Sequence, residues 1–254
     1  FKQKTAYEIM PSLVGSEMCI RDRWAHMEEN HPKYRDEFMK VIKAIDEGVG
    51  EIVEAAGKDV IKIVMSDHGF CSVKKEIYLN YFLETKGYLR YKQDGAKSLE
   101  HIDPKATRVF CMDPGRFYIN LEGREAQGCV SRSEYEALRE ELKHELQELT
   151  DEEGTRVIKD VLVKDEIYSG PNFEIAPDIV INPVDGYDPK GAFGKQSLSG
   201  KGPIVGMHTY HNAMLFVEGH DLKSGGSVVD VTPTICQLLD IKAPADFDGT
   251  SLIT

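Results

Sequence analysis

Three side chains that can bind a transition metal lie next to short apolar segments of the sequence. Asp67 and His68 occur in the stretch Ser-Asp-His-Gly-Phe, directly after the apolar residues 60–65. His208 occurs in Gly-Met-His-Thr-Tyr-His, shortly before the apolar residues 213–217. Carboxylate and imidazole groups are usual ligands of divalent transition metals. We therefore consider Asp67, His68 and His208 as candidate metal ligands.

The elements that must position these ligands can be read from the apolar segments. Residues 60–65 predict a buried strand, so Asp67 and His68 should lie in the loop at its C-terminal end, where ligands bind in open α/β sheets. Gly69 would allow close backbone approach there. A parallel sheet would bring His208, at the entrance of a strand over 213–217, near this loop. In the simpler alternative, Asp67 only accepts backbone hydrogen bonds within a turn.

Helices and strands alternate along the rest of the chain. Apolar residues at steps of three and four predict a helix over residues 32–56, which Gly57 ends. Ser131 and Glu134 form a capping box at the start of a leucine-striped helix that Gly154 closes. Further helices are predicted over 78–89 and from about 232 to 239, the second after a strand-like stretch that begins at 228. Further strands are predicted over 117–121, 157–163 and 178–181. Residues 185–206 are predicted to form a loop. This alternation favours an α/β fold.

Composition limits the classes of partner. The chain has 254 residues and a net charge of −12 without a block of basic residues, so it has no broad surface for nucleic acid. A phosphate substrate would need a local positive centre, which a bound metal could supply. No apolar run is long enough to span a membrane. The five dispersed cysteines indicate thiols in a reducing compartment, which favours the cytoplasm.

Residues 1–23 differ from the rest. This stretch resembles translated sequencing-adapter sequence and shows neither a helical nor a strand period. Such segments are excluded from fold reasoning. We therefore interpret 1–23 as an artefactual tail and 24–254 as the domain.

An ordered set of motifs resembles the type I phosphodiesterase/nucleotide pyrophosphatase family of the alkaline phosphatase superfamily. Ser66-Asp67-His68-Gly69-Phe70 resembles the metal loop of that family, and Gly206-Met207-His208 occupies the position of its third metal histidine. The resemblance extends from about Trp24 to Leu252. Its other motifs are Ile119 to Glu125 around a Gly-Arg pair, Tyr168 to Pro171, Ala176 to Ile179, Asp230 to Thr234, and Pro244 with Asp248 and Gly249.

The resemblance implies a fold and a mechanism. The fold would be alkaline-phosphatase-like, with a mixed or parallel sheet sandwiched by helices, and its N-terminal half would be missing here. Two divalent ions, zinc or alternatively manganese, would be bound, with Asp67, His68 and His208 among their ligands. A Thr or Ser hydroxyl would attack phosphorus and form a phospho-enzyme that water hydrolyses. That nucleophile would lie upstream, so we assign no catalytic residue in this chain and expect the chain as given to be inactive.

Two further residues need an interpretation in the light of this family. Asp22 and His26 have the Asp-x-x-x-His spacing of another ligand pair, but Asp22 falls in the adapter-like stretch. We therefore interpret His26 as an ordinary helix or loop residue. Arg124 could bind phosphate, and we interpret it instead as a surface or salt-bridged residue.

Several alternatives remain open on the sequence. The substrate would be a small phosphate ester, with a nucleotide as one option, and the oligomeric state is undetermined. Cofactor-independent phosphoglycerate mutases and sulfatases are alternatives, because they use metal ions in the same way. A non-catalytic binding or structural role on the same scaffold is the alternative from a different class. Loss of half a sheet would leave an open edge and an uncovered apolar face, so we expect aggregation or marginal folding.

Overall fold

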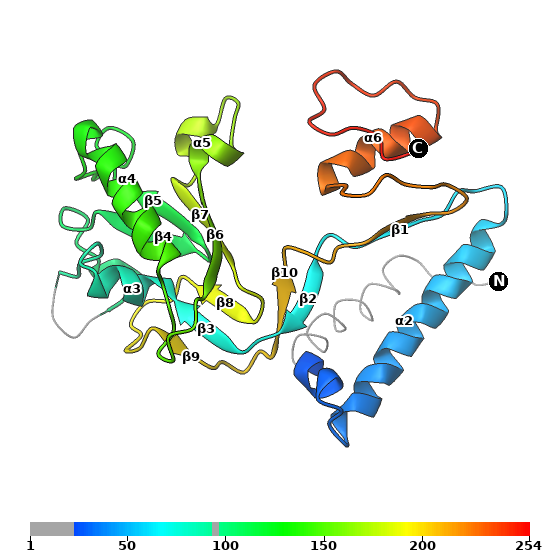
Figure 1. Ribbon diagram of the computed structural model, residues 1–254, viewed down its shortest axis with the longest axis horizontal. Coiled ribbons are helices and arrows are strands. Elements are labelled where there is room, and N and C mark those ends of the chain that lie inside the picture. Colours follow the sequence, from blue (N-terminus) through cyan, green and yellow to red (C-terminus); the bar gives the residue numbers. More distant parts are fainter. Residues whose placement is uncertain (1–22, 93–96) are drawn as a thin grey trace. The chain divides into compact units, whose positions relative to one another are not determined.

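A computed structural model describes residues 23–92 and 97–254, and the chain divides into two compact units. In the described part, unit 1 comprises residues 23–29 and 71–207, and unit 2 comprises residues 30–70 and 208–254. Residues 1–22 of the predicted tail, Asp22 included, lie outside the described residues. Both units combine helices with small sheets, which confirms the α/β class (Figure 1).

Unit 1 is built around an antiparallel sheet of four strands. The three strands predicted over 117–121, 157–163 and 178–181 are all present in it. Helix α4 (Arg132–Gln147) packs against strand β6 of this sheet. In sheet order, the strands are β4 (Val109–Asp113), β5 (Arg116–Ile119), β7 (Ile179–Pro183) and β6 (Ile158–Val163).

Helix α4 begins where its sequence predicts. Ser131 is the N-cap, and the Glu134 carboxylate accepts the backbone N–H of Ser131 at 3.1 Å. The buried stripe consists of Leu138, Leu142 and Leu146. The helix ends at Gln147 rather than near Gly154, because the chain reverses there and the N–H of Val157 donates to the carbonyl of Leu149 at 3.2 Å.

A second sheet in unit 1 corrects the predicted loop over 185–206. Strand β3 (Lys75–Tyr78) pairs in parallel with β8 (Tyr187–Lys190) and antiparallel with β9 (Ser199–Gly200). The sequence of β8 contains a proline and two charged residues, so its strand conformation depends on pairing with β3 rather than on propensity. The short helices of unit 1 are α3 (Leu79–Thr85), η1 (Leu99–His101), α5 (Lys164–Ile167) and η2 (Phe173–Ile175).

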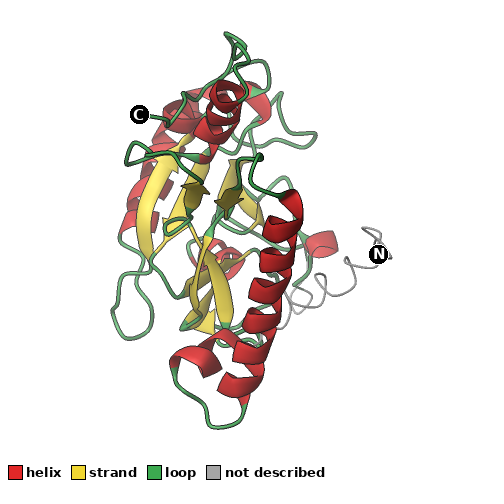
Figure 2. Cartoon of the chain, turned by 90° about the vertical axis from the view of Figure 1, so that its right-hand side faces the viewer, coloured by secondary structure: helices red, strands yellow, loops and turns green. Residues whose placement is uncertain are grey.

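Unit 2 contains the predicted long helix and a two-stranded ribbon. Helix α2 (Tyr34–Ala56) is the long helix of Figure 2. It ends at Gly57, whose φ of 75° suits glycine. Strand β1 (Ile63–Met65) pairs antiparallel with β11 (Leu215–Val217). The segment predicted as strand-like from 228 is instead the helical turn η3 (Val228–Asp230), which leads into α6 (Val231–Leu238). None of the described helices is long and apolar enough to cross a membrane.

The predicted burial of β1 is wrong. Val64 is 39% exposed and Met65 is 43% exposed. A ribbon of two three-residue strands has too few neighbours to cover its own faces, and such ribbons are marginal without further packing. Among the described residues of unit 2, the buried hydrophobic side chains are Phe38, Val217 and Leu252, whereas the large hydrophobic cluster belongs to unit 1.

Strands β2 (Gly69–Ser72) and β10 (Gly206–Thr209) pair with each other. The chain passes from unit 2 to unit 1 within β2 and returns within β10. Asp67 and His68 precede the first crossing, His208 directly follows the second, and all three belong to unit 2.

Candidate metal site

The three predicted ligands lie close together on neighbouring segments of unit 2. Asp67 and His68 follow β1 in the short loop before β2, as predicted, and His208 lies within β10. The imidazole rings of His68 and His208 stack with centroids 3.8 Å apart and an interplanar angle of 22°. The Asp67 Oδ1 atom lies 3.5 Å from His68 Nε2.

The sheet that brings them together is antiparallel and not parallel as predicted. In the β1–β11 ribbon, Met65 is paired with Leu215, and hydrogen bonds between Ser66 and Met214 follow directly after this pair. The N–H of Ser66 donates to the carbonyl of Met214 at 3.0 Å, and the Ser66 hydroxyl accepts the N–H of Met214 at 2.9 Å. Because β1 and β11 run in opposite directions, the segment after β1 meets the segment before β11.

Gly69 makes this close approach possible. A Cβ atom at this position would lie 2.1 Å from the carbonyl oxygen of His211 and 2.4 Å from Oγ1 of Thr209. The first of these contacts is with backbone, which cannot move aside like a flexible side chain. Glycine is therefore required directly after the two candidate ligands, as the sequence suggested.

Replacing Gly69 with alanine is expected to destabilise unit 2 by roughly 1–3 kcal/mol and to displace His68 from His208. Thermal unfolding and histidine NMR shifts would measure the two effects. Gly50→Ala is the matched control, because nothing lies within 4 Å of a Cβ added there. In the interior of α2 that change should be neutral or slightly stabilising. Equal behaviour of the two variants would contradict the close-approach role of Gly69.

The position of the His68 ring defines which nitrogen can bind a metal. Its Nδ1 atom lies 2.9 Å from the carbonyl oxygen of Gly69, so Nδ1 carries the hydrogen and donates. A backbone carbonyl on one ring nitrogen commonly orients a histidine ligand through the other nitrogen. The lone pair of the His68 ring that can bind a metal is therefore on Nε2, and this atom faces Asp67.

The Asp67–His68 geometry fits the edge of a metal polyhedron better than a hydrogen bond. At 3.5 Å the two atoms are at the outer limit for a hydrogen bond. Two ligands of a tetrahedral ion with bonds of about 2.0 Å lie about 3.3 Å apart. The Asp67 side chain is 82% exposed, so the carboxylate can move to a ligand without breaking a buried contact. Within residues 23–92 and 97–254, no three His, Cys, Asp or Glu side chains already surround one ion-sized position.

All three residues line one pocket of about 850 Å³ in unit 2. Lys223 is the only Lys or Arg among the described residues that line it, and its Nζ donates to the carbonyl of Ser251 at 3.0 Å. Thr209 is buried, and its hydroxyl donates to the carbonyl of His211 at 2.7 Å. The pocket thus combines metal-ligand chemistry with one cation. Apart from the positive charge of Lys223, nothing in the sequence indicated that this residue lines the pocket.

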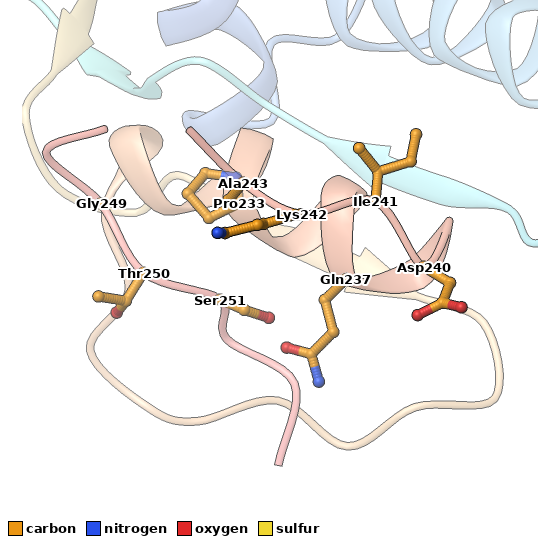
Figure 3. A pocket seen from close by; sticks show the side chains of 9 residues that line it. All are labelled: Pro233, Gln237, Asp240, Ile241, Lys242, Ala243, Gly249, Thr250 and Ser251. Atoms are coloured by element: carbon orange, nitrogen blue, oxygen red, sulfur yellow. The ribbon is translucent and has the colours of Figure 1, made fainter. Parts of the chain in front are cut away.

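A second hollow of unit 2, about 480 Å³ in volume, has a different character (Figure 3). It is lined by two residues of α6, by the segment 240–243 that follows the helix and by the segment 249–251. Asp240 is the only carboxylate and Lys242 the only cation among the described residues that line it, and none of those residues is a histidine. The two histidines of the first pocket therefore have no counterpart in this hollow.

Arg124 has the salt-bridged role that we favoured on the sequence. Its guanidinium forms two hydrogen bonds of 2.7 Å with Asp178, which is fully buried. The hydroxyl of Tyr135 donates to the same carboxylate at 2.6 Å, and the N–H of Ile119 donates to it at 2.7 Å. Burial, together with the hydrogen bond to Asp178, raises the pKa of Tyr135. The Gly-Arg motif thus supports unit 1 through a carboxylate whose partner the sequence alone did not identify.

Comparison with known proteins gives one match. The sequence model of the type I phosphodiesterase/nucleotide pyrophosphatase family matches residues 22–211, a range that contains Asp67, His68 and His208. The C-terminal motifs at Asp230 to Thr234 and at Pro244 to Gly249 lie beyond the matched range. No curated protein and no solved structure matches the sequence. Because the match spans most of the sequence, the chain belongs to the type I phosphodiesterase/nucleotide pyrophosphatase family.

Proposed function

We propose that this chain is part of a metal-dependent hydrolase of phosphate mono- or diesters, with small esters such as nucleotides as substrates. Family membership supports a phosphoesterase in general. The single observation that carries the metal-dependent form is the 3.8 Å stack of His68 on His208, with the Asp67 carboxylate 3.5 Å from His68. Because the chain is acidic, a cation bound by these ligands would supply the positive charge that attracts a phosphate.

Each candidate ligand has a proposed role. The Nε2 atom of His68 and the carboxylate of Asp67 would hold one divalent ion, and His208 would help to hold a second. The stacked rings bring both imidazoles to the same part of the pocket. Two such ions, zinc or alternatively manganese, would supply activation of the attacking hydroxyl and stabilisation of the leaving oxygen. Lys223 would offset the negative charge of the substrate in the same pocket.

The attacking hydroxyl is proposed to come from a Thr or Ser in an upstream segment outside this chain. Two Ser and Thr hydroxyls that line the pocket already form hydrogen bonds with the backbone: Thr209 donates to His211, and Ser66 accepts from Met214. Attack on phosphorus would break the bond to the leaving alcohol and form a phospho-enzyme, which water would then hydrolyse to release the phosphate product and restore the hydroxyl. A Thr upstream favours a nucleotide phosphodiesterase, a Ser favours a mutase, and a modified Cys or Ser favours a sulfatase.

Free thiols at the four described cysteines support a cytoplasmic location.

The chain as given should not turn over a chromogenic phosphodiester above the background of zinc or manganese alone, because a metal-ligand set without a nucleophile cannot perform the two-step reaction. A polypeptide extended with the upstream reading frame is expected to be active and to lose activity on His208→Ala. Hydrolysis of the same ester by both proteins, with and without each metal, would be compared. Robust turnover by the present chain that His208→Ala abolishes would contradict the upstream nucleophile. An extended protein that is equally active with His208→Ala would contradict the metal-dependent hydrolase.

A further inference from the structure

Unit 1 contains a pocket of about 280 Å³ whose lining is rich in charged side chains. The lining residues come from the first half of α4, from α5 and η2, and from the segment after β5. Among the described residues of this lining, four are cations and three are carboxylates. The four cations are Arg124, Arg132, Arg139 and Lys164. Their hydrogen-bond acceptors decide which of them can bind a ligand.

Lys164 is a buried cation whose hydrogen-bond donors are only partly used. Its side chain is 5% exposed, and its ammonium group carries three N–H groups. Among the described residues, the acceptor for Nζ is the carbonyl oxygen of Glu174, at a rather long 3.4 Å. Oδ1 of Asp178 lies 3.8 Å away, beyond hydrogen-bond range, and that carboxylate already accepts four hydrogen bonds from other groups. Two donors of the Lys164 ammonium therefore lack an acceptor in the described part of the chain, which is unusual for a buried polar group.

The charged end of Lys164 lies at the pocket rather than only its stem. Nζ lies 4.6 Å from the centroid of the Phe173 ring and 3.4 Å from the Glu174 carbonyl, and both of these residues line the pocket. A group bound beside Phe173 would thus meet the unused donors.

The other three cations differ in how far their donors are used. Arg124 is held in the buried ion pair described above. Arg139 forms ion pairs with Asp165 and Glu136, and its buried Nε atom has no hydrogen-bond partner among the described residues. Arg132 is exposed and forms no ion pair with a described residue. Two of the three lining carboxylates are thus engaged by Arg139, and the third belongs to an exposed residue. The lining therefore has more unused donors than unused acceptors.

We propose that this pocket binds a small monocarboxylate with an apolar body. Its carboxylate would accept hydrogen bonds from Lys164 and face the charge of Arg132, while its body would contact Leu121 and Phe173. The attraction is local to the unused donors, because the carboxylates of the site offset most of its positive charge. A dianion such as phosphate would bring a second negative charge close to three lining carboxylates, which is unfavourable. The volume is at the small end for ligand sites, which also favours a small ligand.

This site is separate from the proposed metal site in the sequence and in the fold. All of its lining residues belong to unit 1, whereas Asp67, His68 and His208 belong to unit 2. The proposal therefore does not depend on metal binding or on phosphate ester hydrolysis.

Titration of the ¹⁵N-labelled full chain with benzoate, followed by amide NMR shifts, tests the proposal. We expect a saturable shift at the pocket residues with a Kd of about 1–10 mM, as suits a ligand of so few atoms. Benzamide, which has the same shape without the charge, and the variant Lys164→Gln should each weaken binding at least about tenfold, because a charge-assisted hydrogen bond is lost. Lys143→Gln is the matched control, since Lys143 also lies on α4 and pairs with Glu166 at 3.7 Å but does not line the pocket.

Binding of benzoate that Lys164→Gln weakens and Lys143→Gln preserves supports the proposal. Absence of a saturable shift up to about 100 mM benzoate, equal affinity for benzamide, or tighter binding of inorganic phosphate would overturn it. Should circular dichroism show that Lys164→Gln does not fold, Arg132→Gln takes its place, because Arg132 is exposed and its loss leaves no buried partner. That variant should weaken benzoate binding about threefold, and unchanged affinity would contradict the proposed site.

Discussion

Replacing Asp178 with asparagine is expected to lower the free energy of unfolding of unit 1 by about 3–5 kcal/mol. The fully buried carboxylate accepts two hydrogen bonds from Arg124, one from Tyr135 and one from the N–H of Ile119. The neutral amide would remove the buried counter-charge of the Arg124 guanidinium, which is only 10% exposed, and would leave it only the half-buried Glu125, 2.9 Å from its Nε atom. Removal of one partner from a buried pair is costly because the remaining charge cannot recover its hydration.

Asp113→Asn is the matched control for this prediction. Asp113 also pairs with an arginine, Arg116, at 2.9 Å, but its side chain is 60% exposed. Loss of an exposed pair should cost less than about 1 kcal/mol. Urea unfolding, followed by circular dichroism for both variants, would measure the difference. Similar losses for Asp178→Asn and Asp113→Asn would show that burial does not govern the Arg124–Asp178 pair.

Replacing His208 with alanine is expected to lower the affinity for the second zinc ion by at least about a hundredfold, since even residues that only support metal ligands change affinity 10–100-fold. The variant removes one of the two stacked imidazoles and leaves Asp67 and His68 in place. Isothermal titration of the purified chain with zinc would measure the change.

His144→Ala is the control for zinc binding. His144 lies on the exposed face of α4 in unit 1, away from the leucine stripe. Its removal should leave zinc affinity unchanged. A chain whose zinc affinity falls equally with His144→Ala and His208→Ala would bind the metal through scattered surface imidazoles, and the proposed site would be wrong.

Local sequence signals were sufficient for elements that carry their own start and stop residues. The capping box of Ser131 and Glu134 fixed the first residue of α4, and Gly57 fixed the end of α2. Strands without such signals depend on distant partners. The chain of β8 becomes a strand through its parallel pairing with β3, about 110 residues away in sequence. Its composition alone therefore predicted a loop.

Candidate ligands were easier to predict than the way in which they meet. Asp67, His68 and His208 are chemically distinctive, and the structure places the two histidine rings in contact. The strand β1 is present as predicted, but its burial and its parallel arrangement were predicted wrongly. Burial depends on what covers β1, and the sequence of β1 does not contain that information. The partners of Arg124 were missed for the same reason: Asp178 lies 54 residues away in sequence.

Zinc K-edge X-ray absorption of the chain loaded with two zinc ions tests the metal site most directly. Imidazole scattering from one histidine at each ion, with nitrogen at about 2.0–2.1 Å from zinc, is the expected result, and His68→Ala or His208→Ala should each reduce it. A spectrum with only oxygen or sulfur neighbours, or one that neither substitution changes, would contradict metal binding by Asp67, His68 and His208.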